Sequence, residues 1–188
     1  MKLVVGLGNP GAKYRQTRHN VGYMTLAELA GRYPGCSPKA KFHGDFLDIR
    51  DRSGQTVYLL CPTTYMNRSG LSVAEAAKFY KIIPENVLVV CDDLNLPFAK
   101  LRMRSEGGSG GQKGLADIIR CLGTEKFPRL RFGIGEPPGQ MDAANFVLMN
   151  FTEKERPELA VTLKEAADAV ELWLSTGIGE AMNRYNGK

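Results

Sequence analysis

Two histidines occur in this 188-residue chain, and His19 is the one whose setting could support chemistry. It lies in a polar loop after the apolar run LVV at 3–5, while Asp92 directly follows a second apolar run, NVLVVC at 86–91. Such runs predict buried strands, and open α/β sheets place their sites at the carboxyl ends of strands. A carboxylate that accepts a hydrogen bond from one imidazole nitrogen leaves the other nitrogen free to take a proton from water. The pattern therefore predicts a His19–Asp92 dyad that activates water.

The sequence offers no covalent nucleophile or metal ligand set in a recognised pattern. No Gly-x-Ser-x-Gly turn occurs, and no cysteine stands beside a plausible base, so an acyl-enzyme is not expected. The four cysteines form no Cys-x-x-Cys pair and have no cluster of histidines nearby, which argues against zinc. We therefore expect direct attack by water, with no metal.

The glycine pattern Gly6-x-Gly8-x-x-Gly11 follows the first predicted strand and suggests a dinucleotide-binding turn. That turn needs its third glycine inside a helix and an acidic residue about 20 positions later. Here Pro10 precedes Gly11, no apolar helical face follows, and position 31 is glycine. We interpret the glycines as a tight turn and expect no cofactor. A nicotinamide-dependent dehydrogenase is therefore the third and least favoured interpretation, and it would require measurable binding of NAD or NADP.

A second candidate site is cationic. Alternation along the predicted strands 100–104 and 129–135 projects five cations from the sheet, namely Lys100, Arg102, Arg104, Arg129 and Arg131. Between them, EGGSGGQKG at 106–114 opens onto a predicted helix whose free N–H groups suit a phosphate, with Lys113 adding a charge. The formal net charge is +5. This succession predicts a site for a nucleic acid, bound through phosphates and weakened by salt.

The elements that position these residues follow from hydrophobic periodicity. Strands are predicted at 3–5, 45–49, 56–61, 86–91, 100–104 and 129–135, and helices at 20–33, 72–81, 114–122, 152–174 and 178–185. The pairs Ser72/Glu75 and Thr152/Glu155 have capping-box spacing at two helix starts. The order predicts a single-domain three-layer α/β/α sandwich over 1–188, around a twisted mixed sheet with an early hairpin. No signal peptide or membrane span is recognised, so we expect a cytoplasmic protein.

Five blocks of the sequence resemble, in order, the signature blocks of bacterial peptidyl-tRNA hydrolases. They are GLGNPGAKYRQTRHNVG at 6–22, PTTYMNRSG at 62–70, CDDLNLP at 91–97, GGSGGQKGLADII at 107–119 and RLRFGIG at 129–135. The resemblance covers nearly the whole chain, and the block that contains RHN is highly specific. It implies a monomeric, cofactor-free esterase that cuts the bond between a peptide and the 3′-terminal ribose of tRNA.

The resemblance also implies roles for single residues. It makes His19 the general base and Asp92 its orienting carboxylate, and Asn9 and Asn67 the amides that hold and polarise the peptide-ester end. Taken alone, Asn67 is more typical of a turn or a helix cap. Two further residues are implied to line the same pocket, Tyr14 and Met66. Arg104 and Arg131 match basic positions that bind a tRNA phosphate, and Arg102 belongs to the same strip.

One block departs from the family pattern. Gly111-Gln112-Lys113-Gly114 stands where Gly-His-Asn-Gly is usual, so Lys113 replaces an asparagine that helps to position water or substrate. Lysine donates hydrogen bonds but cannot accept them. We expect Lys113 either to bind the terminal phosphate or to support developing negative charge. The change also leaves open an RNA-binding protein of the same fold that has lost hydrolysis.

Overall fold

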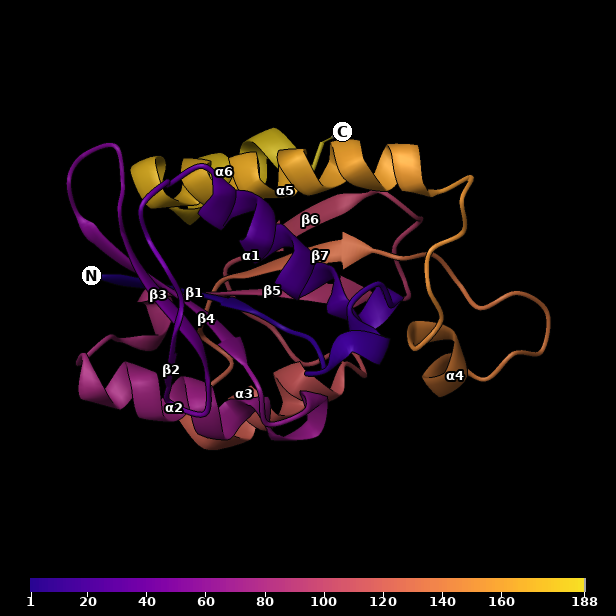
Figure 1. Ribbon diagram of the computed structural model, residues 1–188, viewed down its shortest axis with the longest axis horizontal. Coiled ribbons are helices and arrows are strands. Elements are labelled where there is room, and N and C mark those ends of the chain that lie inside the picture. Colours follow the sequence, from indigo (N-terminus) through magenta and orange to yellow (C-terminus); the bar gives the residue numbers. More distant parts are fainter. Residues whose placement is uncertain (188) are drawn as a thin grey trace.

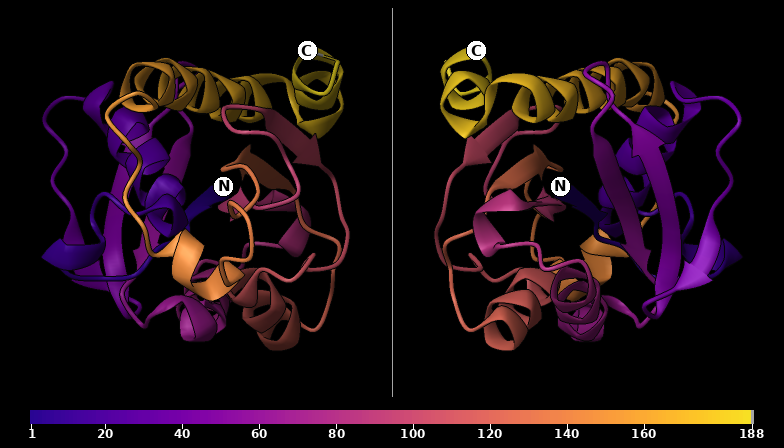
Figure 2. Two further views of the ribbon diagram at one scale, coloured as in Figure 1. Left: turned by 90° about the vertical axis from the view of Figure 1, so that its right-hand side faces the viewer. Right: turned by 90° about the vertical axis from the view of Figure 1, so that its left-hand side faces the viewer.

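The computed structural model, which describes residues 1–187, contains a seven-stranded sheet with helices on both faces (Figures 1 and 2). The strands are β1 Lys2–Gly6, β2 Lys39–Lys41, β3 Gly44–Arg50, β4 Thr56–Pro62, β5 Val87–Asp93, β6 Leu101–Arg104 and β7 Arg129–Gly133. The helices are α1 Val21–Gly31, α2 Ser69–Phe79, α3 Lys113–Leu122, α4 Ala143–Val147, α5 Arg156–Thr176 and α6 Ile178–Tyr185. The predicted α/β/α architecture is confirmed.

The sheet is mixed, with its parallel strands in the middle. Its order is β2-β3-β4-β1-β5-β7-β6. Strands β4, β1, β5 and β7 run parallel, whereas β3 pairs antiparallel with β4 and β6 with β7. Every residue of β5 is buried, because this strand lies between β1 and β7 and is covered on both faces. The four parallel strands therefore end at one edge, where loops from distant parts of the sequence meet.

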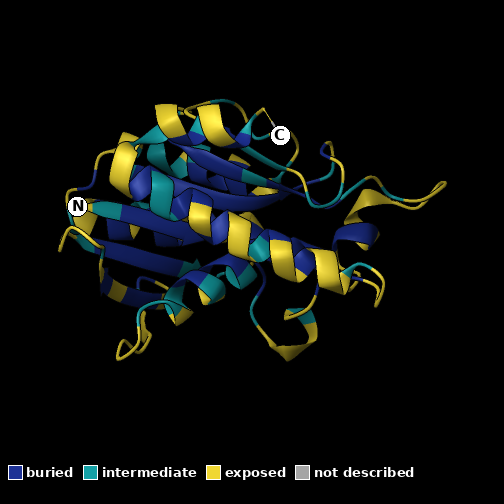
Figure 3. Ribbon diagram, turned by 90° about the horizontal axis from the view of Figure 1, so that it is seen from above, coloured by how far each residue is buried: buried dark blue, intermediate teal, exposed yellow. Residues whose placement is uncertain are grey.

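Two apolar cores fill the spaces between the sheet and its helices. Helices α1 and α5 pack together over one face, and their core includes the buried ring of Trp173. Helices α2 and α3 pack over the other face, around side chains such as Ile118 and Phe127. Figure 3 shows the buried strands and the exposed outer sides of the helices. Because each buried apolar side chain of this size contributes roughly 1.5–3 kcal/mol, these cores hold the carboxyl edge of the sheet in place.

The glycines at the end of β1 and just after it allow a close approach between β1 and α1. A Cβ atom on Gly6 would lie 2.4 Å from the carbonyl oxygen of Gly22 in α1, and one on Gly8 would lie 2.7 Å from the ring of Tyr23. Gly11 alone among the three has a positive φ, of 104°. The first two glycines therefore serve packing, and the residues between β1 and α1 form short 3₁₀ turns instead of extending α1 toward β1.

The predicted start of α2 is wrong, and α5, predicted from 152, begins at Arg156. Helix α2 begins at Ser69 and not at Ser72, because a 3₁₀ turn at Met66–Arg68 leads directly into it and the Ser69 hydroxyl donates to the Met66 carbonyl. Ser72 lies inside the helix, and its buried hydroxyl has no hydrogen-bond partner within residues 1–187. Its spacing from Glu75 is therefore coincidental.

The second capping box is confirmed. The Thr152 N–H donates to the Glu155 carboxylate at 2.7 Å, and the Glu155 N–H donates to the Thr152 hydroxyl at 3.3 Å, just before α5. Elements β2 and α4 were not predicted, since three and five residues are too few to show a periodicity. Within residues 1–187, none of the helices has the length and apolar character needed to span a membrane.

Candidate active site

A pocket of about 770 Å³ lies at the carboxyl edge of the parallel strands. Its walls come from the loop after β1, the 3₁₀ turn before α2, the end of β5, the start of α3, and α4. The left view of Figure 2 shows α4 in front of this edge, between the loop after β1 and α3. Seven of the residues singled out from the sequence line it: Asn9, His19, Met66, Asn67, Asp92, Lys113 and Arg131.

His19 and Asp92 are in contact in this pocket. His19 Nδ1 lies 2.8 Å from Asp92 Oδ2, although 73 positions separate the two residues in the chain. A 3₁₀ turn at Arg18–Asn20 holds the histidine directly before α1, and the aspartate is the penultimate residue of β5. Their side chains are 11% and 3% exposed. The imidazole therefore reaches the pocket while the carboxylate behind it is shielded from water.

The second carboxylate oxygen of Asp92 contacts a residue that sequence reasoning missed. Gln112 Nε2 donates to Asp92 Oδ1 at 3.0 Å, and Gln112 Oε1 accepts from the Leu115 N–H at 2.8 Å. The signal in the sequence is weak: Gln112 lies two residues before the predicted helix 114–122, near the helix start where short side chains with an acceptor oxygen are favoured.

Asn9 joins the loop after β1 to the turn before α2. Its Oδ1 accepts from the Met66 N–H at 2.8 Å, while its backbone N–H donates to Asn20 Oδ1 at 2.9 Å. Because a backbone N–H must face the amide oxygen, this contact fixes the orientation of the Asn9 amide and leaves Nδ2 as its donor for a ligand. Asn67 is exposed on the same pocket, and Met66 is buried beneath it.

Tyr14 does not line the pocket in which it was expected. It ends a 3₁₀ turn at Ala12–Tyr14, its carbonyl accepts from the Thr17 hydroxyl, and the Lys13 ammonium lies 4.8 Å from its ring centroid. The chain turns at this point before it reaches His19, which leaves the Tyr14 ring outside the pocket wall.

The start of α3 is less open to a phosphate than predicted. Gln112 caps the Leu115 N–H, so this donor is not free. Lys113 is the first residue of α3; its side chain is exposed at the pocket.

The predicted cationic strip is divided by burial. Arg129 is only 1% exposed, and its guanidinium donates to the carbonyl groups of Gly107, Gly108 and Glu125. It therefore fixes the glycine-rich loop and does not project into solvent, contrary to the prediction. Strand alternation places it correctly on the face shared with Arg131, but the loop folds over it.

Three predicted phosphate ligands remain partly or fully accessible. Arg131 lines the pocket, and its Nε lies 2.6 Å from Asp93 Oδ2. Arg102 and Arg104 lie opposite Arg131 and Arg129 in the β6–β7 register, and Arg104 is exposed. Because Asp93 is buried, part of the charge of Arg131 is already neutralised.

Arg18, one of the polar residues of the predicted loop, has a structural role that the sequence did not indicate. It is buried, its two terminal nitrogens each lie 2.8 Å from a Glu155 carboxylate oxygen, and its guanidinium carbon lies 4.5 Å from the centroid of the Phe146 ring and 4.8 Å from that of Phe151. The backbone N–H of Arg18 also donates to the Met149 carbonyl. This cluster, the Arg18 clasp, ties the histidine loop to the segment that carries α4.

Two other features bear on the chemistry. Burial raises the pKa of the Cys91 thiol, which lies against the pocket, and so keeps it protonated. No group of three or more histidine, cysteine, aspartate or glutamate side chains within residues 1–187 is arranged to hold a metal ion.

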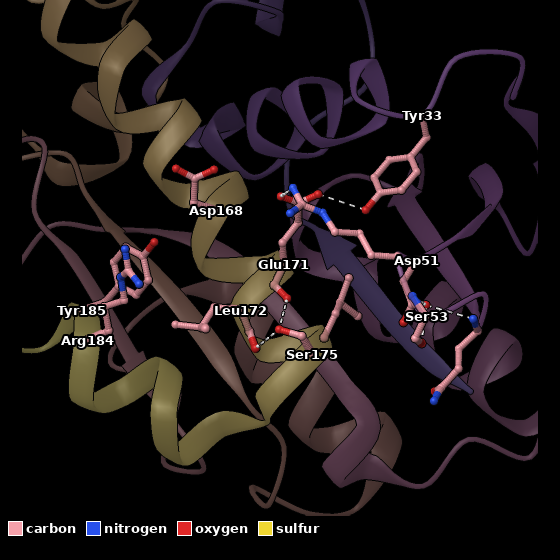
Figure 4. Close-up of a pocket in the computed structure, with 12 residues that line it drawn as sticks. Tyr33, Asp51, Ser53, Asp168, Glu171, Leu172, Ser175, Arg184 and Tyr185 are labelled. Atoms are coloured by element: carbon pink, nitrogen blue, oxygen red, sulfur yellow. Dashed lines mark hydrogen bonds and ion pairs between the residues drawn. The ribbon is translucent and has the colours of Figure 1, made fainter.

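A separate pocket of about 610 Å³ lies between the β3–β4 hairpin and helices α5 and α6, at the other end of the parallel strands (Figure 4). Among its lining residues, Arg52 forms an ion pair with Glu171 at 3.5 Å, and the Tyr33 hydroxyl donates to the Glu171 carboxylate. None of the predicted site residues lines this pocket, so we assign the chemistry to the pocket at the carboxyl edge.

Fold and pocket define the class of protein: a hydrolase on a three-layer α/β sandwich, with a contacting imidazole and carboxylate at an open pocket. The model of the family described as Peptidyl-tRNA hydrolase matches residues 3–188, and the chain belongs to that family. The peptidyl-tRNA hydrolase of Rhodopirellula baltica is 50% identical over 186 residues, which cover 99% of this chain and 97% of the relative. That of Chloroflexus aggregans is 49% identical over 187 residues and covers 99% of each.

Solved structures give the same relationship. The crystal structure of peptidyl-tRNA hydrolase from Acinetobacter baumannii matches with a TM-score of 0.91 and 39% sequence identity. The match covers 99% of this chain and 94% of that one.

Proposed function

We propose that this protein hydrolyses the ester bond between a peptide and the 3′-terminal ribose of tRNA, and so recycles tRNA from prematurely released peptidyl-tRNA. The observation that carries the proposal is the 2.8 Å contact between His19 and Asp92 at an open pocket, in a chain of this family. Action as a monomer in the cytoplasm, without metal or cofactor, is part of the proposal.

In this mechanism His19 is the general base. Asp92 accepts from Nδ1–H, so Nε2 carries the free lone pair and takes a proton from water as the water oxygen attacks the ester carbonyl. The tetrahedral intermediate then collapses, the bond to the ribose oxygen breaks, and that oxygen takes the proton back from the imidazolium. No covalent enzyme intermediate forms, in keeping with the buried, protonated Cys91.

The two asparagines act on the acyl group. Asn9 donates from Nδ2, while the Met66 N–H holds its Oδ1, and Asn67 lies exposed on the same pocket. Donors held in this way stabilise the negative charge that develops on the carbonyl oxygen. Arg102, Arg104 and Arg131 bind the phosphates of the acceptor end, which positions the ester without reading its sequence.

His19→Ala is expected to lower kcat for an N-blocked aminoacyl-tRNA by roughly 10²–10⁴-fold, the usual contribution of a positioned base. The release of the labelled acyl group measures the rate of hydrolysis. His43→Ala is the matched control, because His43 is the other histidine of the chain and its exposed ring lies 3.3 Å from the Glu75 carboxylate, outside the pocket. Wild-type rates in His19→Ala would refute the assignment. Binding of tRNA without turnover by the wild-type protein would instead favour the non-hydrolytic alternative.

A further inference from the structure

Gln112 joins the backbone of α3 to the Asp92 carboxylate. Its Oε1 accepts from the Leu115 N–H at 2.8 Å, and its Nε2 lies 3.0 Å from Asp92 Oδ1. Asp92 in turn contacts His19 Nδ1 through its other oxygen, at 2.8 Å. One continuous hydrogen-bonded chain therefore runs from the first turn of α3 to the imidazole.

The orientation of the Gln112 amide is determined at both ends. A backbone N–H can only donate, so the atom facing Leu115 is the amide oxygen. A carboxylate accepts, so the atom facing Asp92 is the amide nitrogen. A flipped amide would place two donors together at one end and two acceptors at the other.

Packing holds this side chain where it lies. Gln112 Nε2 also lies 3.1 Å from the Met66 sulfur. A Cβ atom on Gly114 would lie 2.6 Å from that sulfur and 3.0 Å from Gln112 Oε1, so the absence of a side chain at Gly114 leaves room for the contact.

We infer that Gln112 is a positioning residue for the hydrolysis: by donating to Asp92 Oδ1 it fixes the rotation of the carboxylate, which presents Oδ2 to His19 Nδ1. The imidazole is thereby kept in the tautomer whose Nε2 faces the pocket as an acceptor. This inference rests on the proposed function. Gln112 acts through Asp92 and takes no proton itself.

The kinetic test replaces both hydrogen-bonding groups while nearly keeping the volume. Gln112→Met is expected to lower kcat roughly 10- to 100-fold with KM within about threefold, the effect of a misaligned base and not of weaker substrate binding. Gln112→His keeps a ring N–H and recovers most of the rate. Gln55→Met, in the β3–β4 turn far from the pocket, is the matched control and keeps wild-type values.

A spectroscopic test is independent of activity. The ¹⁵N shifts of the His19 ring report its tautomer, and His43 serves as an internal reference because the chain has only these two histidines. We expect a protonated Nδ1 and an unprotonated Nε2 in the neutral wild-type ring, a mixture of tautomers in Gln112→Met, and no change at His43.

Three outcomes separate the possibilities. A variant Gln112→Met that melts at a lower temperature but keeps the wild-type kcat and His19 tautomer makes Gln112 a helix cap only and overturns the inference. A wild-type protein that does not hydrolyse the substrate refutes the proposed function, while the ring shifts still test the hydrogen-bonded chain. Should Gln112→Met fail to fold, the NMR signals of the Gln112 side-chain amide are compared between the wild type and Asp92→Asn. These signals differ between the two proteins if Gln112 contacts Asp92, and they are unchanged if it does not.

Discussion

Lys113 is a single residue whose charge works against its helix. As the first residue of α3 it places a positive charge at the positive end of the helix dipole, which is unfavourable by about 0.3–1 kcal/mol. Lys113→Met is therefore expected to raise the free energy of unfolding by that amount and to lower kcat/KM by roughly tenfold at low salt, if the ammonium contacts an anionic part of the substrate. Urea unfolding and steady-state kinetics measure the two effects.

Lys78 offers the matched control for Lys113. It is exposed in the last turn of α2, where a positive charge is favourable. Lys78→Met should lower stability slightly and leave kcat/KM unchanged. A Lys113→Met variant with unchanged kcat/KM at low salt would remove Lys113 from the site.

Residue types and spacing predicted which side chains meet at the carboxyl edge but not how they are covered. His19 and Asp92 could be predicted because both follow apolar strands that end at one edge. The burial of Arg129 could not, because alternation gives the face of a strand and says nothing of a loop that folds over it. Gln112 was missed because its position before a helix predicts a bond to the helix backbone and does not show that its side chain also reaches Asp92 at the end of β5.

At the scale of elements, the Arg18 clasp holds the segment with α4 against the histidine loop. Burial disfavours the ionised Glu155, but hydrogen bonds from Arg18 and Thr152 outweigh this, and the pKa of Glu155 is lowered from its ordinary 4.5. A carboxyl group whose folded-state pKa is lowered adds stability above its ordinary pKa and loses it as the pH falls through the folded-state value.

Glu155→Gln is therefore expected to lower the free energy of unfolding by about 1.5–3 kcal/mol at neutral pH, the usual range for a hydrogen bond to a charged group. The difference from wild type should shrink as the pH falls below 4.5. Urea unfolding between pH 7 and pH 3 measures it. Glu153→Gln, at an exposed neighbour, should follow the wild-type curve at every pH. A difference for Glu155→Gln that does not depend on pH would contradict the role of its charge.

The same segment shows why element boundaries were predicted unevenly. Thr152 and Glu155 form a real capping box because the chain before Thr152 is irregular and leaves the N–H groups at the start of α5 to be capped. Ser72 has the same spacing from Glu75, but the turn at Met66–Arg68 continues into α2 and makes a cap at that point unnecessary. Spacing alone does not distinguish the two cases, since the difference lies in the preceding backbone.

At the scale of the whole molecule, the sheet separates the accessible arginines from the opposite helical layer. Arg102 and Arg104 lie on the face of β6 that is opposite Met103, and Met103 packs in the core on the side of α6. Arg131 shares their face but is paired with the buried Asp93. Removing Arg131 would leave the buried Asp93 carboxylate without its ion-pair partner. An Arg131 variant would therefore lose stability as well as tRNA affinity, and the two effects could not be separated.

Salt dependence gives the cleaner measure of tRNA binding. For Arg102→Gln and Arg104→Gln, the plot of log K for tRNA against log salt is expected to be shallower by about 0.7–0.9 for each phosphate that the variant no longer neutralises, because fewer counterions are released. At saturating substrate, both variants should hydrolyse the ester at nearly the wild-type rate. Lys164→Gln, on the exposed side of α5, removes the same charge from the opposite layer and should keep the wild-type slope. Equal slopes in all three variants would mean that the protein attracts tRNA through its net charge of +5 and not through this strip.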